Sequence, residues 1–139
     1  PELARQGEAV SRDILRLLVR PAGRHVVLLP GAHGFEHAAH TVVNPSYYAF
    51  PAIRALARAV PDPAWLRIAA DGLALLRDGG FGRWSLPPDA LAVPRGEGEL
   101  APAPGWPARF SYDAVRVPLY LAWAGLEGEP AANRATRFW

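Results

Sequence analysis

The sequence predicts an all-α protein with short β hairpins and long loops. Several segments place apolar side chains three and four residues apart, which is the spacing of one helix face. One of them, residues 62–79, also has clear start and stop signals, and the segments between helices are rich in proline and glycine. The last predicted helix, residues 111–125, is apolar on nearly every face, and such a helix is normally buried. We therefore expect the chain to be part of a larger helical assembly.

The N-terminal part is expected to form one helix followed by extended segments. Residues 8–20 have the helical spacing, and Pro21 and Gly23 are expected to end this helix. Residues 25–31, HVVLLPG, form a short apolar run closed by Pro-Gly and predict a strand. Residues 31–43 show no helical period, so we expect a hairpin or a long loop there.

Two helices are expected in the middle of the chain. Residues 49–59 form the first, with Ile53 on its buried face. The second has Asp62 as its N-cap, Pro63 as its first helical residue and Gly79 as its C-terminal stop. The predicted apolar face of this second helix consists of Leu66, Ala69, Leu73 and Leu76.

The C-terminal part combines a long loop region with a further helix. Residues 80–110 hold many of the prolines and glycines, with one short strand expected at residues 89–93. Residues 111–125 are expected to form a helix that is capped by Ser111 and kinked at Pro118. The remaining tail contains the start of another helix.

Composition excludes several classes of function. The chain has 139 residues, half of them apolar, a net charge of +2 and no cysteine. Disulfides and thiolate zinc sites are therefore excluded. The basic residues are all arginine and are scattered, so nucleic acid is not an expected partner. No run of about 18 apolar residues occurs, so no membrane-spanning helix is expected. No signal peptide is visible either.

Two stretches resemble signatures of a known enzyme family. NPSYYAFPAIRALA at residues 44–57 and SYDAVRVPLYLAWAG at residues 111–125 are similar to the N-P-S-Y and S-Y-D-A-x-R motifs of glycoside hydrolase family 8, the bacterial cellulases and related endoglucanases. LLPGAHGF at residues 28–35 and GGFGRWSLPPDAL at residues 79–91 support this, and the order fits over roughly residues 8–127. The likeness is greatest to the periplasmic cellulases associated with cellulose synthesis.

The resemblance implies an (α/α)6 barrel of twelve helices in concentric layers. Twelve helices of average length with their connections need on the order of 300 residues. The 139 residues are therefore expected to form a partial barrel, a single incomplete catalytic domain lacking helices on both sides.

The resemblance also implies an inverting hydrolysis. Inversion requires one carboxylic acid that protonates the leaving oxygen and one carboxylate that activates water. Asp113 matches the general base, Tyr112 precedes it, and Arg116, one helical turn further, can keep the carboxylate ionised and oriented. A structural alternative remains, in which Asp113 complements the helix dipole beside the Ser111 cap.

The first signature implies substrate-binding roles for Asn44 and Tyr47. A structural role is equally compatible with them, because Asn44 begins a turn and Ser46 can cap the next helix. Trp84 and Trp106 lie in long loops, where exposed rings can stack on sugars or simply pack against the loop. All four are candidate substrate-binding residues.

The general acid of the family is a glutamate in an S-E-G-Q-x-Y type of motif. No such motif occurs in this chain, and the D-G-D type of acidic motif is missing too. The chain therefore carries the base half of a two-carboxylate site.

A zinc site is the remaining catalytic alternative. His33, Glu36 and His37 spell H-x-x-E-H, which serves zinc peptidases when a helix places both histidines on one face. Gly34 lies between them, and the segment shows no helical period. We expect an incidental hairpin, no metal and no organic cofactor.

These observations predict a fragment of an inverting endo-β-1,4-glucanase acting on cellulose or a related β-glucan. Its expected partners are the polysaccharide, the remainder of its own catalytic domain and the cellulose synthesis machinery. Export to the periplasm or outside the cell follows from the resemblance. Two alternatives stay open: a degenerate, noncatalytic glucan-binding helical protein, and a zinc hydrolase that uses His33, Glu36 and His37.

Overall fold

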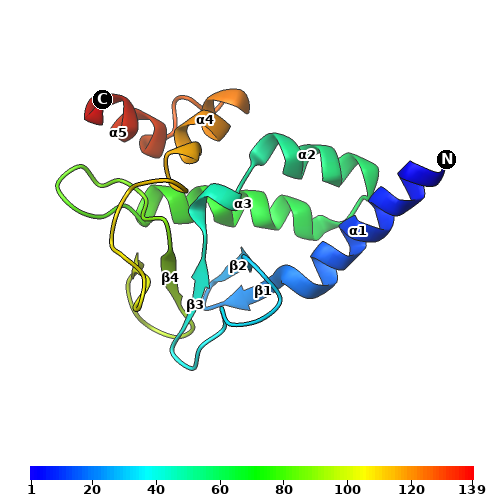
Figure 1. Ribbon diagram of the computed structural model, residues 1–139, viewed down its shortest axis with the longest axis horizontal. Helices are drawn as coiled ribbons and strands as arrows, with labels where there is room; N and C mark the ends of the chain where they lie inside the picture. The colour runs from blue at the N-terminus through cyan, green and yellow to red at the C-terminus, as the bar shows by residue number, and fades with distance from the viewer.

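Five α-helices, one 3-10 helix and five short strands make up the computed structural model, which describes residues 1–139 (Figure 1). The elements are, in chain order, α1 (Glu2–Leu18), β1 (Val19–Ala22), β2 (His25–Leu28), β3 (His40–Val43), η1 (Pro45–Tyr47), α2 (Phe50–Ala59), α3 (Pro63–Asp78), β4 (Leu91–Pro94), β5 (Ala101–Pro102), α4 (Arg116–Trp123) and α5 (Pro130–Phe138). The expected combination of helices with small antiparallel hairpins is confirmed.

Helix α1 is longer at its start and shorter at its end than residues 8–20, the range that the sequence predicted. Charged pairs three and four residues apart, such as Glu2 with Arg5 and Glu8 with Arg12, support its polar first turns. The helix ends at Leu18, and Pro21 lies inside strand β1. Pro21 therefore does not end the helix. It belongs to a strand whose only recorded partner is β2, and an edge strand tolerates proline.

The strands form two small antiparallel sheets. Strands β1 and β2 make a hairpin that pairs Val19 with Leu28, and β3, β4 and β5 form a second sheet in that order. The predicted hairpin at residues 31–43 is confirmed by the bridge between Glu36 and Thr41. The strand predicted at residues 89–93 is present as β4, shifted toward the C-terminus.

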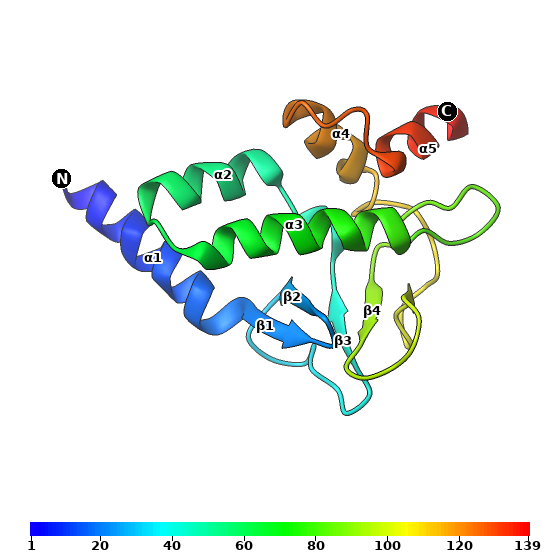
Figure 2. The ribbon, with the colours of Figure 1, turned by 180° about the vertical axis from the view of Figure 1, so that it is seen from behind.

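Helix α3 is the central element, with α2 beside it, the strands on one side and α4 and α5 near its C-terminal half (Figures 1 and 2). Its predicted boundaries are confirmed: the Asp62 carboxylate accepts a hydrogen bond from the Ala64 N–H (2.8 Å), and Gly79 ends the helix. Of the predicted apolar face, Leu66 is wrong because it is 73% exposed, whereas Leu76 is buried and Ala69 and Leu73 pack against the core. The side chains that α3 actually buries are Trp65, Ile68, Leu75 and Leu76.

The core lies where α3 meets η1 and strand β2. Tyr48 is fully buried there, and its hydroxyl oxygen accepts a hydrogen bond from the Leu28 N–H (3.1 Å). Burial raises the pKa of Tyr48 far above its ordinary value, so the phenol is neutral. A Cβ atom at Gly72 of α3 would overlap the Tyr48 ring. Gly72 is therefore the position at which α3 admits this aromatic side chain.

Helix α4 begins at Arg116, so the predicted helix over residues 111–125 and its Ser111 cap were wrong at the start. Residues 112–115 form turns, and the Ser111 hydroxyl donates its hydrogen bond to another segment. Pro118 lies in the first turn of α4, where its missing N–H needs no partner, and therefore it does not kink the helix.

Helix α4 buries one apolar face and leaves another exposed in residues 1–139. Leu119 is 59% exposed and Trp123 is 72% exposed, although Val117 and Leu121 on the opposite side belong to the core. The expectation that α4 is buried on all sides does not hold within residues 1–139. No helix is both long enough and apolar enough to cross a bilayer.

We predict that Gly72→Ala destabilises the fold. The added methyl group meets the rigid, buried Tyr48 ring, and overpacking of this kind costs about 1–3 kcal/mol. The measurement is the melting temperature of the complete protein, followed by circular dichroism. Gly7→Ala is the matched control, since Gly7 also lies within a helix but has no atom within 4 Å of its Cβ position. Its better helix propensity should leave the melting temperature unchanged or slightly raised. An equally stable Gly72→Ala protein would contradict the packing described here.

Candidate active site

Asp113 lies in the turn that precedes α4. The turn is closed by hydrogen bonds from the Val115 N–H to the Ser111 carbonyl (3.0 Å) and from the Arg116 N–H to the Asp113 carbonyl (3.1 Å). The sequence placed Asp113 inside a helix, and the structure places it just outside. The backbone of Asp113 is therefore part of a short turn and not of a helix.

Arg116 pairs with Asp113. The Arg116 guanidinium donates to the Asp113 carboxylate, and both side chains are about one-third exposed. The Tyr112 ring is largely exposed, and its centroid lies 5.8 Å from the guanidinium carbon of Arg116. The three residues that the sequence named as catalytic therefore form one group at the surface, with a carboxylate whose orientation is set by an arginine.

The hydroxyphenyl ring of Tyr47 lies near this group. Tyr47 and Arg116 both line a hollow of about 340 Å³, whose other walls are mostly apolar side chains from α1, β2 and α4. The lining consists of Ile14, Leu18, Leu28, Leu29, Pro30, Ser46, Tyr47, Ala49, Arg116 and Tyr120. The structure thus brings Tyr47 of the first signature and Arg116 of the second to one hollow, although they are 69 positions apart in the chain.

Asn44 has a clear structural role. Its carboxamide oxygen accepts hydrogen bonds from the Ser46 N–H (3.0 Å) and the Ser46 hydroxyl (2.7 Å), which caps η1. The cap that the sequence suggested Ser46 would give the next helix is not formed, because α2 begins after Ala49 with no side-chain cap. The structural alternative for Asn44 is borne out, and a contact of Asn44 with substrate remains a prediction.

The two loop tryptophans are not part of this group. Trp84 packs edge-on against Phe138 of α5, with ring centroids 6.2 Å apart, and Trp106 is half-exposed in the loop after β5. Neither lines the hollow that contains Tyr47 and Arg116. Their use as sugar-stacking rings stays a prediction.

Asp89 holds the turn that carries Asp113, and the sequence gave no indication of this. The Asp89 carboxylate accepts hydrogen bonds from the Ser111 N–H (3.1 Å), the Ala114 N–H (2.9 Å) and the Ser111 hydroxyl. Partial burial favours the neutral acid and raises the pKa of Asp89, but these hydrogen bonds outweigh it and keep the pKa below its ordinary value. Asp89 is therefore ionised near neutral pH.

The histidine segment is a loop, as expected. His37 stacks on His40 with ring centroids 4.8 Å apart, and the Glu36 carboxylate lies between Arg20 (3.8 Å) and Arg95 (3.9 Å). No three histidine, aspartate or glutamate side chains in residues 1–139 are arranged to hold a metal ion. Glu36 thus serves as an ion-pair partner of two arginines.

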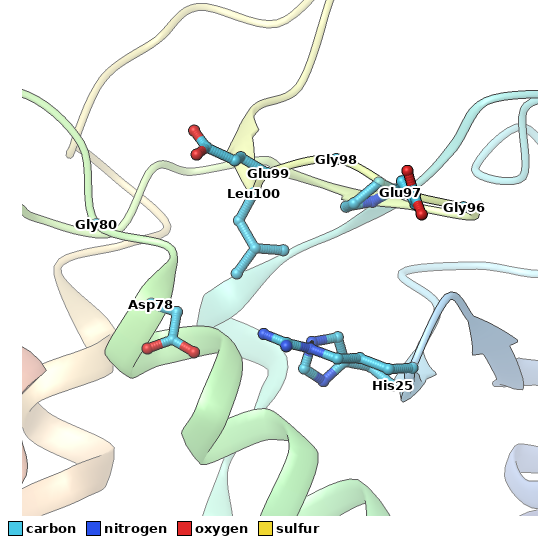
Figure 3. A pocket seen from close by; sticks show the side chains of 10 residues that line it. His25, Asp78, Gly80, Gly96, Glu97, Gly98, Glu99 and Leu100 are labelled. Atoms are coloured by element: carbon cyan, nitrogen blue, oxygen red, sulfur yellow. The ribbon is translucent and has the colours of Figure 1, made fainter.

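A second hollow, of about 550 Å³, lies between the C-terminal end of α3 and residues 96–100 (Figure 3). Its walls are mostly polar, with Asp78 on one side and His25 on the other, and Arg24 is a further lining residue. Burial lowers the pKa of His25 despite the opposing charge of Asp71, so the imidazole is neutral at pH 7. The hollow contains none of the residues that the sequence selected, and it has no Trp, Tyr or Phe side chain for stacking on a sugar ring.

The family assignment rests on nearly the whole chain. The family model for glycosyl hydrolases family 8 matches residues 3–138. The chain belongs to this family. The two signatures on either side of the Tyr47 and Arg116 hollow are therefore family 8 motifs in a family 8 chain.

Named relatives are endoglucanases. The chain is 44% identical to the "Probable endoglucanase" of Novacetimonas hansenii over all 139 residues and 41% identical to the endoglucanase of Cellulomonas uda over 120 residues. The structure of endo-beta-1,4-glucanase CMCax from Acetobacter xylinum matches the whole chain with a TM-score of 0.95 at 44% identity. The chain spans 41% of the Novacetimonas protein and 44% of the Acetobacter structure.

We predict that the His33, Glu36 and His37 segment does not bind zinc. Glu36 is engaged by two arginines and the segment is not helical, so the side chains cannot converge on one ion. Elemental analysis of untagged protein should find the same zinc content in the wild type and in a His33→Ala, His37→Ala variant. One equivalent of zinc per chain that disappears in the double variant would contradict this.

Proposed function

We propose that the chain is part of an inverting glycoside hydrolase that cleaves internal β-1,4-glucosidic bonds of cellulose or a related β-glucan. The observation that carries the proposal is the Asp113 carboxylate, which is oriented by Arg116 beside the hollow that Tyr47 lines. Membership of family 8 and the similarity to endoglucanases support the substrate class.

In this mechanism Asp113 is the general base. Its carboxylate accepts a proton from the attacking water, and the water adds to the anomeric carbon from the face opposite the leaving oxygen. The Arg116 guanidinium donates a hydrogen bond to this carboxylate and fixes its direction toward the reacting water. Tyr112, whose ring is exposed beside this pair, is available to the substrate or the water.

The general acid comes from residues outside this chain. An inverting site needs the acid at about 6.5–9.5 Å from the base so that water fits between substrate and base. Within residues 1–139, Glu36 and Glu129 are in ion pairs with arginines, and Glu97 and Glu99 line the separate polar hollow. None of these glutamates lines the hollow that contains Tyr47 and Arg116.

In this proposal the polysaccharide lies across the hollow that Tyr47 and Arg116 line. The half-exposed ring of Tyr47 gives a sugar an aromatic surface, and Asn44 lies at the start of the same turn. Trp84 and Trp106 are outlying rings for more distant sugar units. No metal or organic cofactor takes part, since carboxyl groups alone perform this chemistry.

The remainder of the catalytic domain is the main protein partner. The exposed faces of α4, with Leu119 and Trp123, are the surfaces that neighbouring helices of an (α/α)6 barrel would cover. The share of the relatives that the chain spans is consistent with such a partial barrel. The substrate class favours export to the periplasm or outside the cell, where the enzyme would act beside cellulose synthesis.

We predict that Asp113→Asn in the complete enzyme lowers kcat on the order of 10²–10⁴-fold, the usual contribution of general acid–base catalysis. KM should remain nearly unchanged, because the base acts mainly in the transition state. The assay is the release of reducing ends from carboxymethylcellulose, and the same variant should also be assayed for binding to the polymer.

Asp78→Asn is the control for this experiment. Asp78 lies in the polar hollow of Figure 3, so its substitution should leave kcat within about twofold. A loss below tenfold for Asp113→Asn would remove it from the base role. Binding without hydrolysis by the wild-type enzyme would favour the noncatalytic glucan-binding alternative.

We also predict that residues 1–139 expressed alone are inactive and self-associate. The general acid is absent from these residues, so hydrolysis is not expected. The exposed apolar side chains of α4 should associate with those of a second molecule. Size-exclusion chromatography and a reducing-sugar assay measure the two properties. Co-expression with the rest of the parent protein should restore a monodisperse species and hydrolysis together. A monomeric, cooperatively folded and active 139-residue chain would contradict both the partial-domain proposal and the missing acid.

A further inference from the structure

We infer that Asp89 is a positioning residue for catalysis: its carboxylate fixes the turn that presents Asp113, on both sides of that residue. The inference rests on the proposed role of Asp113 as base. The Asp89 carboxylate binds the N–H and the hydroxyl of Ser111, two residues before Asp113, and the N–H of Ala114, the residue directly after it.

The turn needs such a partner because its own backbone leaves these N–H groups unbonded. The first N–H groups of a helical segment have no acceptor within the segment. In most helices a nearby side chain supplies one, but α4 has no side-chain cap, and the Ser111 hydroxyl is directed to Asp89 as a donor. The acceptor therefore comes from a residue 22 positions earlier than Ser111 and 25 earlier than Ala114.

The main chain of Asp89 fixes the entry to the same turn. The Asp89 N–H donates to the Arg109 carbonyl (2.9 Å), and the Arg109 guanidinium lies 3.6 Å from the Asp89 carboxylate. One residue thus contacts the segment before the turn, the start of the turn and the residue after Asp113. The Asp113 carboxylate itself pairs with Arg116, so Asp89 acts on the position of Asp113 through the backbone alone.

Asp89 is well placed to serve as this fixed point. It lies two residues before β4, the central strand of its sheet, and both the intervening Ala90 and Leu91, the first residue of β4, are buried. In the register of β3 with β4, Val43 faces Leu91, so β3 continues into Asn44 and Tyr47 at the end of the sheet from which Asp89 emerges. The same sheet therefore carries the Tyr47 turn on one strand and the support of the Asp113 turn on the next.

Position matters strongly for a general base. A displacement of about 1 Å at a reacting group can cost on the order of 10²-fold in rate. Loss of the Asp89 carboxylate should release the turn and should lower kcat far more than it raises KM, since the substrate-binding surface around Tyr47 is held by Asn44 and Tyr48 instead.

The test is a graded pair of variants in the complete enzyme. Asp89→Ala removes all three acceptor contacts and should lower kcat on the order of 10²-fold with KM within about threefold. Asp89→Asn keeps an oxygen for the Ser111 and Ala114 N–H groups, and its amide can donate to the Ser111 hydroxyl, so it should retain most of the lost rate. This rescue also keeps the inference testable if Asp89→Ala folds poorly.

Asp62→Ala is the matched control. Asp62 also uses its carboxylate to accept an N–H at a helix start, but at the opposite end of α3 from the Asp113 turn. Its loss should lower the melting temperature as an N-cap deletion does, with kcat of the folded protein unchanged. If Asp89→Ala lowers the melting temperature by a similar amount but also leaves kcat within about threefold of wild type, the inference is wrong.

A double variant separates positioning from general destabilisation. If Asp89 acts through Asp113, adding Asp89→Ala to Asp113→Asn should cause no further loss of kcat, because groups that act as a unit are strongly non-additive. Multiplication of the two losses would overturn the inference. If Asp113→Asn alone retains activity, the proposed role of Asp113 as base is wrong. If Asp113→Asn is inactive but Asp89→Ala has the kcat of the wild type, the base role stands and only the inference about Asp89 is wrong.

Discussion

The contact between Tyr48 and Gly72 joins the elements on which the candidate site depends. The ring occupies the space that a glycine leaves open on α3, and the hydroxyl binds the backbone of β2 at Leu28. Tyr47 is adjacent in sequence but points to the surface, into the hollow that Arg116 also lines. The buried Tyr48 thus fixes the position of the turn, and this turn positions the exposed side chain of Tyr47.

The small β3-β4-β5 sheet gives this arrangement its rigidity. Interior positions such as Val43, Leu91 and Val93 are almost completely buried, so the register of β3 with β4 is fixed by packing. The two segments that form the candidate site leave this sheet at the same end. A small three-stranded sheet thus places two turns, while the helices supply most of the buried core residues.

The elements with local signals could be predicted from the sequence, and those with distant partners could not. Helix α3 was bounded correctly because Asp62, Pro63 and Gly79 act within one turn of its ends. The start of α4 was misplaced because Ser111 has the side chain of a cap but donates to Asp89. The buried face of α3 was predicted only in part, because apolar residues occupy adjacent positions: Trp65 and Ile68 are buried, whereas the predicted Leu66 is exposed. The candidate site residues Tyr112, Asp113 and Arg116 came from the family signature. Asp89 lies in the GGFGRWSLPPDAL stretch that also supports the family, but no local pattern connects it with Ser111 and Ala114, which lie 22 and 25 residues further along the chain.

The short segment at residues 104–108 contains Trp106. Its two ends are both hydrogen-bonded to Asp89 and Ala90, the adjacent residues directly before β4. The Ala103 N–H donates to the Ala90 carbonyl (3.0 Å), and the Asp89 N–H donates to the Arg109 carbonyl (2.9 Å). Because the ends are tied so close together, the segment can change length without moving what lies beneath it, and each doubling of a flexible loop costs only about 0.6 kcal/mol. We therefore expect that residues 104–108 can be lengthened, shortened or exchanged by grafting while the framework of the Asp113 turn stays constant.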